Sequence, residues 1–237
     1  MFDLLLYPYA GPVPSISVST PLIRQFNSDG SATLSWTATK KKNAITAITV
    51  DGTSVVPTGN TQTGTKSVTA THSSSGLSSV TQVVQTFTMS VADGTTTPTA
   101  TATITWRHKI YWGKVDLSAI SNPDLTLHPG LSPSVVPYCD DDTIKALTGA
   151  GVGTGSDLVT SYSKTYTDID GGGQYLVFAH PTVFGAKPKF LYNGLNSVAF
   201  TKVRSNDDFV TDTGLVVKYD VWIRNTQDFS PTTIIIS

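Results

Sequence analysis

The chain has 237 residues, of which 39% are hydrophobic and only 14% are charged, and its formal net charge is -1. This length suits one or two domains with ordinary cores. The near-neutral charge argues against a nucleic-acid partner, because affinity for phosphate backbones depends on clustered Lys and Arg. The single cysteine, Cys139, excludes an intramolecular disulfide and a multi-cysteine metal site.

Residues 1–14 are predicted to form an extended arm. The arm holds the apolar and aromatic residues Phe2, Leu4, Leu5, Leu6, Tyr7 and Tyr9, of which the first five are the candidates for an assembly contact. Pro12 and Pro14 follow, and their fixed φ angles favour an extended chain. Such an apolar end should not lie in water, so two alternatives stay open: the arm packs on its own domain, or it docks on a neighbouring subunit. Asp3 and Pro8 argue against a signal peptide and a membrane span, so we expect cytoplasmic synthesis and no membrane insertion.

Residues 15–106 are predicted to form an immunoglobulin-like β-sandwich. Strand patterns occur at Ile16–Ser19, Ala32–Thr39, Ile45–Val50, Lys66–Thr71, Val83–Ala92 and Ala100–Trp106. In the last two segments apolar residues alternate with threonine, so one face of each can cover a core, and Asp93-Gly94 lies in the turn between them. Six or seven short strands in about 90 residues are typical of an immunoglobulin-like fold, with Trp36 as a core residue.

Residues 107–237 are predicted to form a second β-sandwich. Its expected strands are Ser163–Thr167, Tyr175–His180, Lys189–Tyr192, Ala199–Val203, Leu215–Ile223 and Thr232–Ile236. One short helix is expected at Asp140–Leu147, with acidic residues at its start and Gly149 after its end. Asp140, Asp141 and Asp142 could bind a cation, but because they run directly into this helix we expect them to cap its N-terminus.

No motif for catalysis is found. The glycine-rich stretches 149–155 and 171–173 lack the strand, helix and Lys-Ser/Thr context of a phosphate-binding loop. The histidines, which are His72, His108, His128 and His180, show no metal-ligand spacing. No serine lies in a nucleophile-elbow motif, and Cys139 has no nucleophile signature around it. We therefore expect no catalytic residue, no metal and no cofactor.

Three segments of the second module resemble a known family. They are RHKIYWG, QYLVFAHPTVFG and the closing VKYDVWIRNTQDFSPTTIIIS. Together they resemble the C-terminal β-sandwich module of bacteriophage tail-fibre and baseplate structural proteins, in which a threonine-rich immunoglobulin-like module commonly precedes this segment. Tyr219, Val221 and Arg224 are similar to the Y-x-V-x-R strand that ends the family's module. The resemblance covers roughly residues 100–237.

The resemblance implies a non-enzymatic structural component of a phage virion. The expected place is the tail, as a fibre, baseplate or decoration protein that contributes to assembly and to host attachment; a capsid or neck fibre or decoration protein is the less favoured variant. It also implies other virion proteins as partners, a homo-oligomer such as a trimer or hexamer, and a host-surface glycan or receptor as a further partner.

Two other classes of function stay open. One is a carbohydrate-binding module, for which Tyr111, Trp112 and Trp222 could offer flat stacking faces, although core packing is the commoner fate of strand aromatics. The other is a depolymerase, which would need a cleft with two facing carboxylic acids of perturbed pKa. No sequence feature nominates such a pair.

Overall fold

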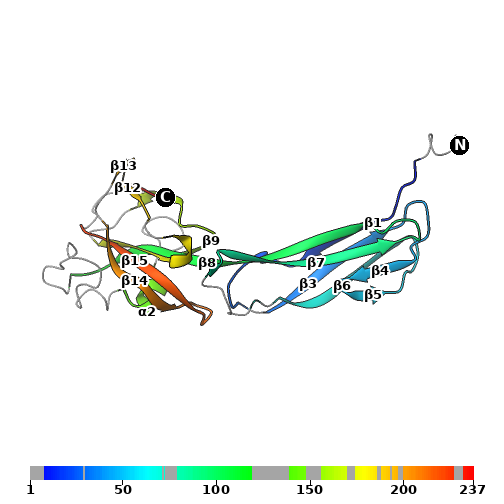
Figure 1. The fold of residues 1–237 in the computed structure, drawn as a ribbon, viewed down its shortest axis with the longest axis horizontal. Helices are drawn as coiled ribbons and strands as arrows, with labels where there is room; N and C mark the ends of the chain where they lie inside the picture. Colours follow the sequence, from blue (N-terminus) through cyan, green and yellow to red (C-terminus); the bar gives the residue numbers. More distant parts are fainter. Residues whose placement is uncertain are drawn as a thin grey trace. The chain divides into compact units, whose positions relative to one another are not determined.

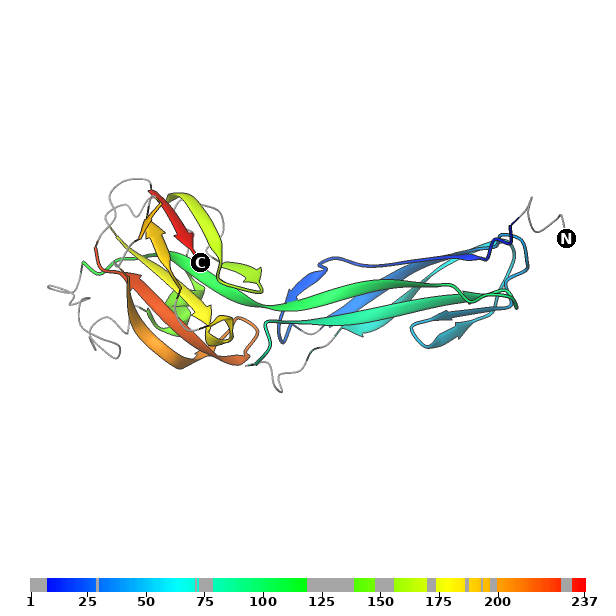
Figure 2. The ribbon, with the colours of Figure 1, turned by 45° about the horizontal axis from the view of Figure 1, so that its top comes forward.

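The computed structural model describes residues 8–28, 30–70, 72, 79–118, 139–147, 156–169, 174–185, 188–192, 194–196, 200–226 and 232–237. These residues form antiparallel sheets with one short α-helix and one 3-10 turn, which confirms the predicted all-β fold (Figure 1, Figure 2). The chain divides into two compact units. Unit 1 comprises Met1–Arg24, Ser28–His72 and Val83–Trp106; unit 2 comprises Gln25–Asn27, Ser73–Gln82 and Arg107–Ser237.

Unit 1 is a sandwich of a three-stranded and a four-stranded layer. Its strands are β1 (Val13–Val18), β2 (Ile23–Gln25), β3 (Gly30–Thr39), β4 (Ala47–Val50), β5 (Thr53–Val55), β6 (Thr61–Ala70), β7 (Gln82–Ala92) and the first part of β8 (Thr99–Val115). One layer has the order β1-β3-β6, and the other has the order β8-β7-β4-β5. This pairing of non-consecutive strands is that of an immunoglobulin-like sandwich.

The core of unit 1 follows the alternation seen in the sequence. On β7 the side chains of Phe87, Met89 and Val91 are buried, while Thr88 between them is exposed and Ser90 is half-buried. On β3 the buried series includes Leu34 and Trp36. Because side chains of a strand alternate between its faces, each strand presents an apolar side to the core and a hydroxyl side to solvent.

The end of the predicted arm contacts unit 1. Strand β1 begins at Val13, so the last two residues of the arm belong to the sandwich. The hydroxyl of Tyr9 donates a hydrogen bond to the carboxylate of Asp93, and the carbonyl of Ala10 accepts one from the N–H of Lys42 at 3.4 Å. This part of the arm therefore packs on its own domain. The five apolar residues Phe2, Leu4, Leu5, Leu6 and Tyr7 lie outside the described residues.

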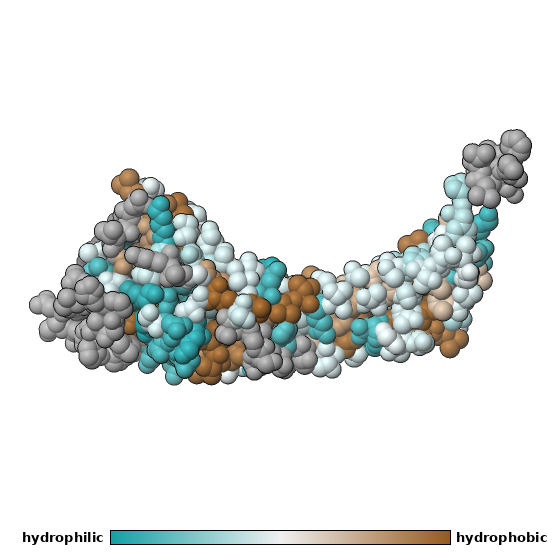
Figure 3. Space-filling model, viewed as in Figure 1, coloured by the Kyte–Doolittle hydropathy of each residue, from teal (hydrophilic) through white to brown (hydrophobic). Residues whose placement is uncertain are grey.

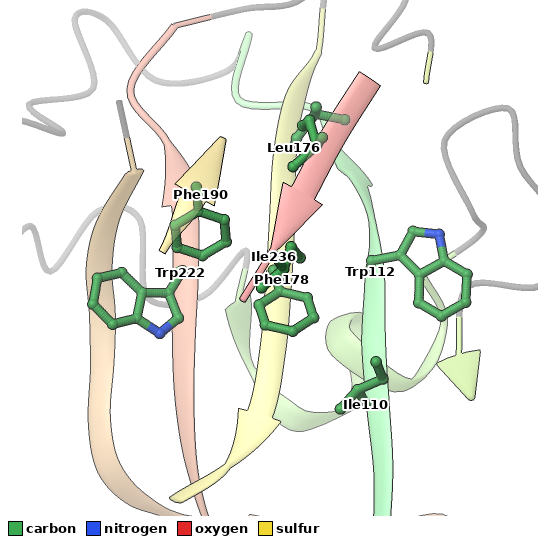
Figure 4. Close-up of a cluster of buried hydrophobic side chains, with 8 residues drawn as sticks. Ile110, Trp112, Leu176, Phe178, Phe190, Trp222 and Ile236 are labelled. Carbon is green, nitrogen blue, oxygen red and sulfur yellow. The ribbon is translucent and has the colours of Figure 1, made fainter. Parts of the chain in front are cut away.

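Unit 2 contains a second pair of sheets. Its further elements are α2 (Asp141–Lys145), β9 (Ser156–Val159), β10 (Lys164–Ile169), β11 (Tyr175–Pro181), the 3-10 turn η3 (Thr182–Phe184), β12 (Phe190–Tyr192), β13 (Leu195–Asn196), β14 (Phe200–Val210), β15 (Val216–Arg224) and β16 (Thr232–Ile236). One sheet has the order β10-β16-β12-β13; the other has β14-β15-β11-β8, with β9 also paired to β8. Apolar side chains from both sheets form one core cluster (Figure 4).

Several element bounds differ from the sequence-based expectation; β6, for example, begins at Thr61 rather than at Lys66, and β14 ends at Val210 rather than at Val203. The strand expected to end at Trp106 continues to Val115, because the burial alternation that includes Trp106 carries on through His108 and Ile110. The strands β2, β5, β9 and β13 have at most four residues and were not predicted, since so few residues carry no clear period. The helix ends at Lys145, two residues before the predicted end.

Candidate functional site

The three aromatic rings nominated for sugar stacking lie in the interior of unit 2. The relative exposures of Tyr111, Trp112 and Trp222 are 0%, 7% and 4%. Trp222 on β15 lies beside Phe190 on β12, with ring centroids 5.8 Å apart, inside the cluster drawn in Figure 4. A sugar ring stacks only on an aromatic face that solvent can reach. These three rings have no such face, which corrects the idea that they form a glycan platform: they are core residues.

Tyr111 belongs to a hydrogen-bonded network at the tip of the β14–β15 hairpin. Its hydroxyl donates to Oδ2 of Asp212 at 3.2 Å, and Nζ of Lys109 donates to the same oxygen at 2.5 Å. The hydroxyl of Tyr219 donates to the carbonyl of Lys109 at 2.6 Å. Burial, followed by the nearby charge of Asp212, raises the pKa of Tyr111 well above its ordinary value. Both phenols therefore stay protonated and act as structural donors rather than as acids or bases.

His180 is fully buried on β11 and uses both ring nitrogens. Its Nδ1 lies 3.1 Å from the carbonyl of Pro181, and its Nε2 accepts a hydrogen bond from Nε1–H of Trp222 at 3.3 Å. The ring packs between Tyr162 and Phe178, with centroid distances of 5.0 Å and 5.6 Å. Burial lowers the pKa of His180. This arrangement fits a neutral imidazole with Nδ1–H as its donor, which stabilises the core and leaves no nitrogen for a metal or a substrate.

The helix α2 is held by the acidic residues singled out in the sequence. Oδ1 of Asp140 accepts a hydrogen bond from the N–H of Thr143 at 2.8 Å, which confirms the predicted N-cap. Asp141 has a role that the sequence did not indicate: its Oδ1 pairs with Nη1 of Arg204 at 2.7 Å, and its Oδ2 accepts from the N–H of Val210 at 2.8 Å. Both oxygens of Asp141 are occupied by β14, so this carboxylate fixes the helix to the sheet rather than binding a cation.

On strand β14, Arg204 forms the contact between the sheet and helix α2. Its side chain is only 8% exposed and also donates to Asp207, to the carbonyl of Asp208 and to the carbonyl of Cys139. Burial raises the pKa of the Cys139 thiol to about 12, so this cysteine is unreactive in the folded protein. Within the described residues, no group of three or more His, Cys, Asp or Glu side chains could hold a metal ion. His128 and both glycine-rich stretches lie outside those residues.

Unit 1 carries an uncharged polar surface on one side of its three-stranded layer. We define the hydroxyl face as the outward side of β1, β3 and β6. Its shallow hollow is lined by Ser15, Ser17, Ser35, Thr37, Thr63 and Thr65, together with Trp36 and Gly64. The strand register places these residues in rows: Ser15 pairs with Thr37, which pairs with Thr63. None of them is charged. The visible surface of unit 1 in Figure 3 is accordingly pale over much of its area, as expected for serine and threonine.

No known protein family, curated protein or solved structure matches the chain. Within the part of the chain that the structure describes, no helix has the length and apolar character that a bilayer crossing requires.

Proposed function

We propose that this chain is a non-enzymatic structural component of a phage virion, associated with the tail as a fibre, baseplate or decoration protein. Its role is in assembly and in attachment to the host surface. The observation that carries the proposal is the hydroxyl face of unit 1: an ordered sheet surface on which the described residues of β1, β3 and β6 turn rows of serine and threonine, and no acidic or basic residue, to the outside.

The polar groups of unit 2 support the same proposal. The side chains of Tyr111, His180 and Arg204 each form hydrogen bonds with partners inside the fold. A catalytic group needs a free acid, base or nucleophile that faces a substrate cavity. Side chains whose donors and acceptors are bonded inside the protein make the fold rigid instead. A structural component of a particle requires such rigidity.

The resemblance to phage tail proteins is the reason that we place this structural role in a virion. In this chain the corresponding strand has one residue more than the family pattern, Y-x-V-x-x-R; its Tyr219 and Val221 are fully buried, and its Arg224 is 9% exposed. Residues in such positions specify packing rather than chemistry. If the segment marks a family, it therefore marks a shared sandwich core, as expected for a structural module.

A deletion experiment tests the proposal. The gene for this chain is deleted from a phage that encodes it, and the deletion phage is grown in host cells with or without a plasmid that expresses the protein. We expect particles made without the protein to lack part of the tail or to fail in adsorption, and the plasmid to restore them. Normal particles with normal adsorption in its absence would refute the proposal, as would turnover of host surface polysaccharide by the purified protein that a single acidic substitution abolishes.

A further inference from the structure

We propose that the free edge of β6 in unit 1 is an interface at which the chain pairs, strand to strand and antiparallel, with β6 of a second copy. The inference depends only on the edge of this strand, so it holds whether or not the protein belongs to a virion.

Among the residues that the structure describes, no strand pairs with the outer side of β6, whose backbone groups there are regularly spaced. β6 is the last strand of the layer β1-β3-β6. The N–H of Lys40 donates to the carbonyl of Asn60, so even-numbered residues of β6 point their backbone groups to β3. Odd-numbered residues point away from β3, and the side-chain amide of Gln85 accordingly reaches the carbonyl of Thr69 at 3.3 Å. Thr61, Thr63, Thr65 and Ser67 thus offer donors and acceptors to a further strand.

The other edges of the described sheets carry features that discourage such pairing; on β10, for example, the register with β16 shifts between Tyr166 and Ile169. On β1 the same register points the backbone of Pro14 outward, and proline has no N–H to donate. On β14 the register shifts between Lys202 and Arg204 and again between Arg204 and Asp207, and Asp141 occupies the N–H of Val210. The edge strands β5 and β13 have only three and two residues. Proteins protect exposed edges by these devices.

The described part of β6 has none of these protections. It runs for ten residues without proline, and the register with β3 is continuous from Thr61 to Ala70. Its one charged residue, Lys66, turns its ammonium group to the β4–β5 turn, where it donates to the carbonyl of Val50 at 3.0 Å and of Asp51 at 2.7 Å. No positive charge of β6 therefore repels an approaching strand.

The side chains of β6 fit a second copy of the same strand. In an antiparallel pair related by a two-fold axis at Thr65, this residue faces its own copy and Thr63 faces Ser67. On the exposed face of this pair, hydroxyl side chains then meet hydroxyl side chains, a pairing that favours sheets. A two-fold contact uses the same surface on both partners and closes after two copies. One strand edge is small compared with a stable interface, so we expect a dimer that forms at high protein concentration.

Charge substitutions at the two-fold axis test the proposal. Sedimentation velocity on the full chain over a concentration series gives the dimer dissociation constant. We expect Thr65→Lys, and separately Thr65→Glu, to raise that constant at least about tenfold, because like charges then lie opposite each other. An equimolar mixture of the two variants should dimerise again, since opposite charges now meet. The matched control is Thr33→Lys, on the exposed side of the central strand β3, which should leave the constant unchanged.

Hydrogen exchange gives a second readout that does not depend on these variants. The amides of Thr63, Thr65 and Ser67 point to the free edge and should exchange more slowly as the wild-type concentration rises, while the amides bonded to β3 stay unchanged. The proposal is overturned if the wild-type protein stays monomeric at about 1 mM, if Thr33→Lys weakens the dimer as much as Thr65→Lys, or if the edge amides show no concentration dependence. Far-ultraviolet circular dichroism confirms that each variant is folded.

Discussion

Replacing Gly64 with alanine tests how closely β3 and β6 pack in unit 1. Gly64 lies directly opposite Trp36 in the register of these strands, and the Trp36 ring is 6% exposed. A Cβ added at Gly64 would lie 2.7 Å from Cε2 and 3.0 Å from Nε1 of that ring, and closer still to Cζ2. Contact this short requires the indole to move, and the core around it is close-packed.

The magnitude follows from two opposing effects. Alanine restricts the unfolded chain more than glycine does, which stabilises the folded state by about 0.4–1 kcal/mol. Overpacking in a well-packed core costs about 1–3 kcal/mol. We therefore expect Gly64→Ala to lower the free energy of unfolding of unit 1 by roughly 0–2.6 kcal/mol.

The assay is urea unfolding followed by circular dichroism, in the wild type and in a Trp36→Leu background. In that background the clash is gone, so Gly64→Ala should be neutral or stabilising. Thr63→Val is the matched control: it replaces one β-branched side chain by another of nearly the same shape on the exposed face of the same strand, and it should change stability by less than about 0.5 kcal/mol. The packing argument is refuted if Gly64→Ala stabilises the wild type, or if its cost is the same with and without the indole.

Four further predictions concern other contacts. Lys66→Met should destabilise unit 1 by about 1–2 kcal/mol in the same assay, because it removes the hydrogen bonds to the β4–β5 turn. Burial lowers the pKa of His180 from 6.5, so the unfolded chain binds more protons; unit 2 should lose stability as the pH falls below about 6.5, and His180→Phe should reduce that slope. Cys139 should react with a thiol reagent only after unfolding. Deleting residues 1–14 should lower the melting temperature, since it removes the Tyr9–Asp93 hydrogen bond and two residues of β1.

Much of the fold could be predicted because it depends on local periodicity. The alternation around Phe87 and Met89 fixed which side of β7 is buried, and the aspartates before α2 contain a capping residue. Contacts between distant segments could not be predicted in this way. Asp141 and Arg204 are separated by 63 residues, and no pattern in either segment indicates the other. The opposition of Trp36 and Gly64 also depends on strand register, which the sequence alone did not specify.

The candidate site residues show the same limit more clearly. An aromatic residue on an amphipathic strand looks the same in sequence whether its ring faces a core or a ligand. Tyr111 and Trp112 are adjacent on β8, so alternation alone would place one of them in solvent, yet both are buried. Each side of this part of β8 is covered by other elements of unit 2, which is information that only the tertiary structure contains.

The central proposal, that the chain is a structural virion protein, is tested most directly by immunogold electron microscopy on purified phage particles, with antibody raised against the recombinant protein. The account predicts gold at one fixed position on the tail of every particle, and none on particles grown without the gene. Particles that carry no label, while the infected lysate holds the protein in free form, would contradict it.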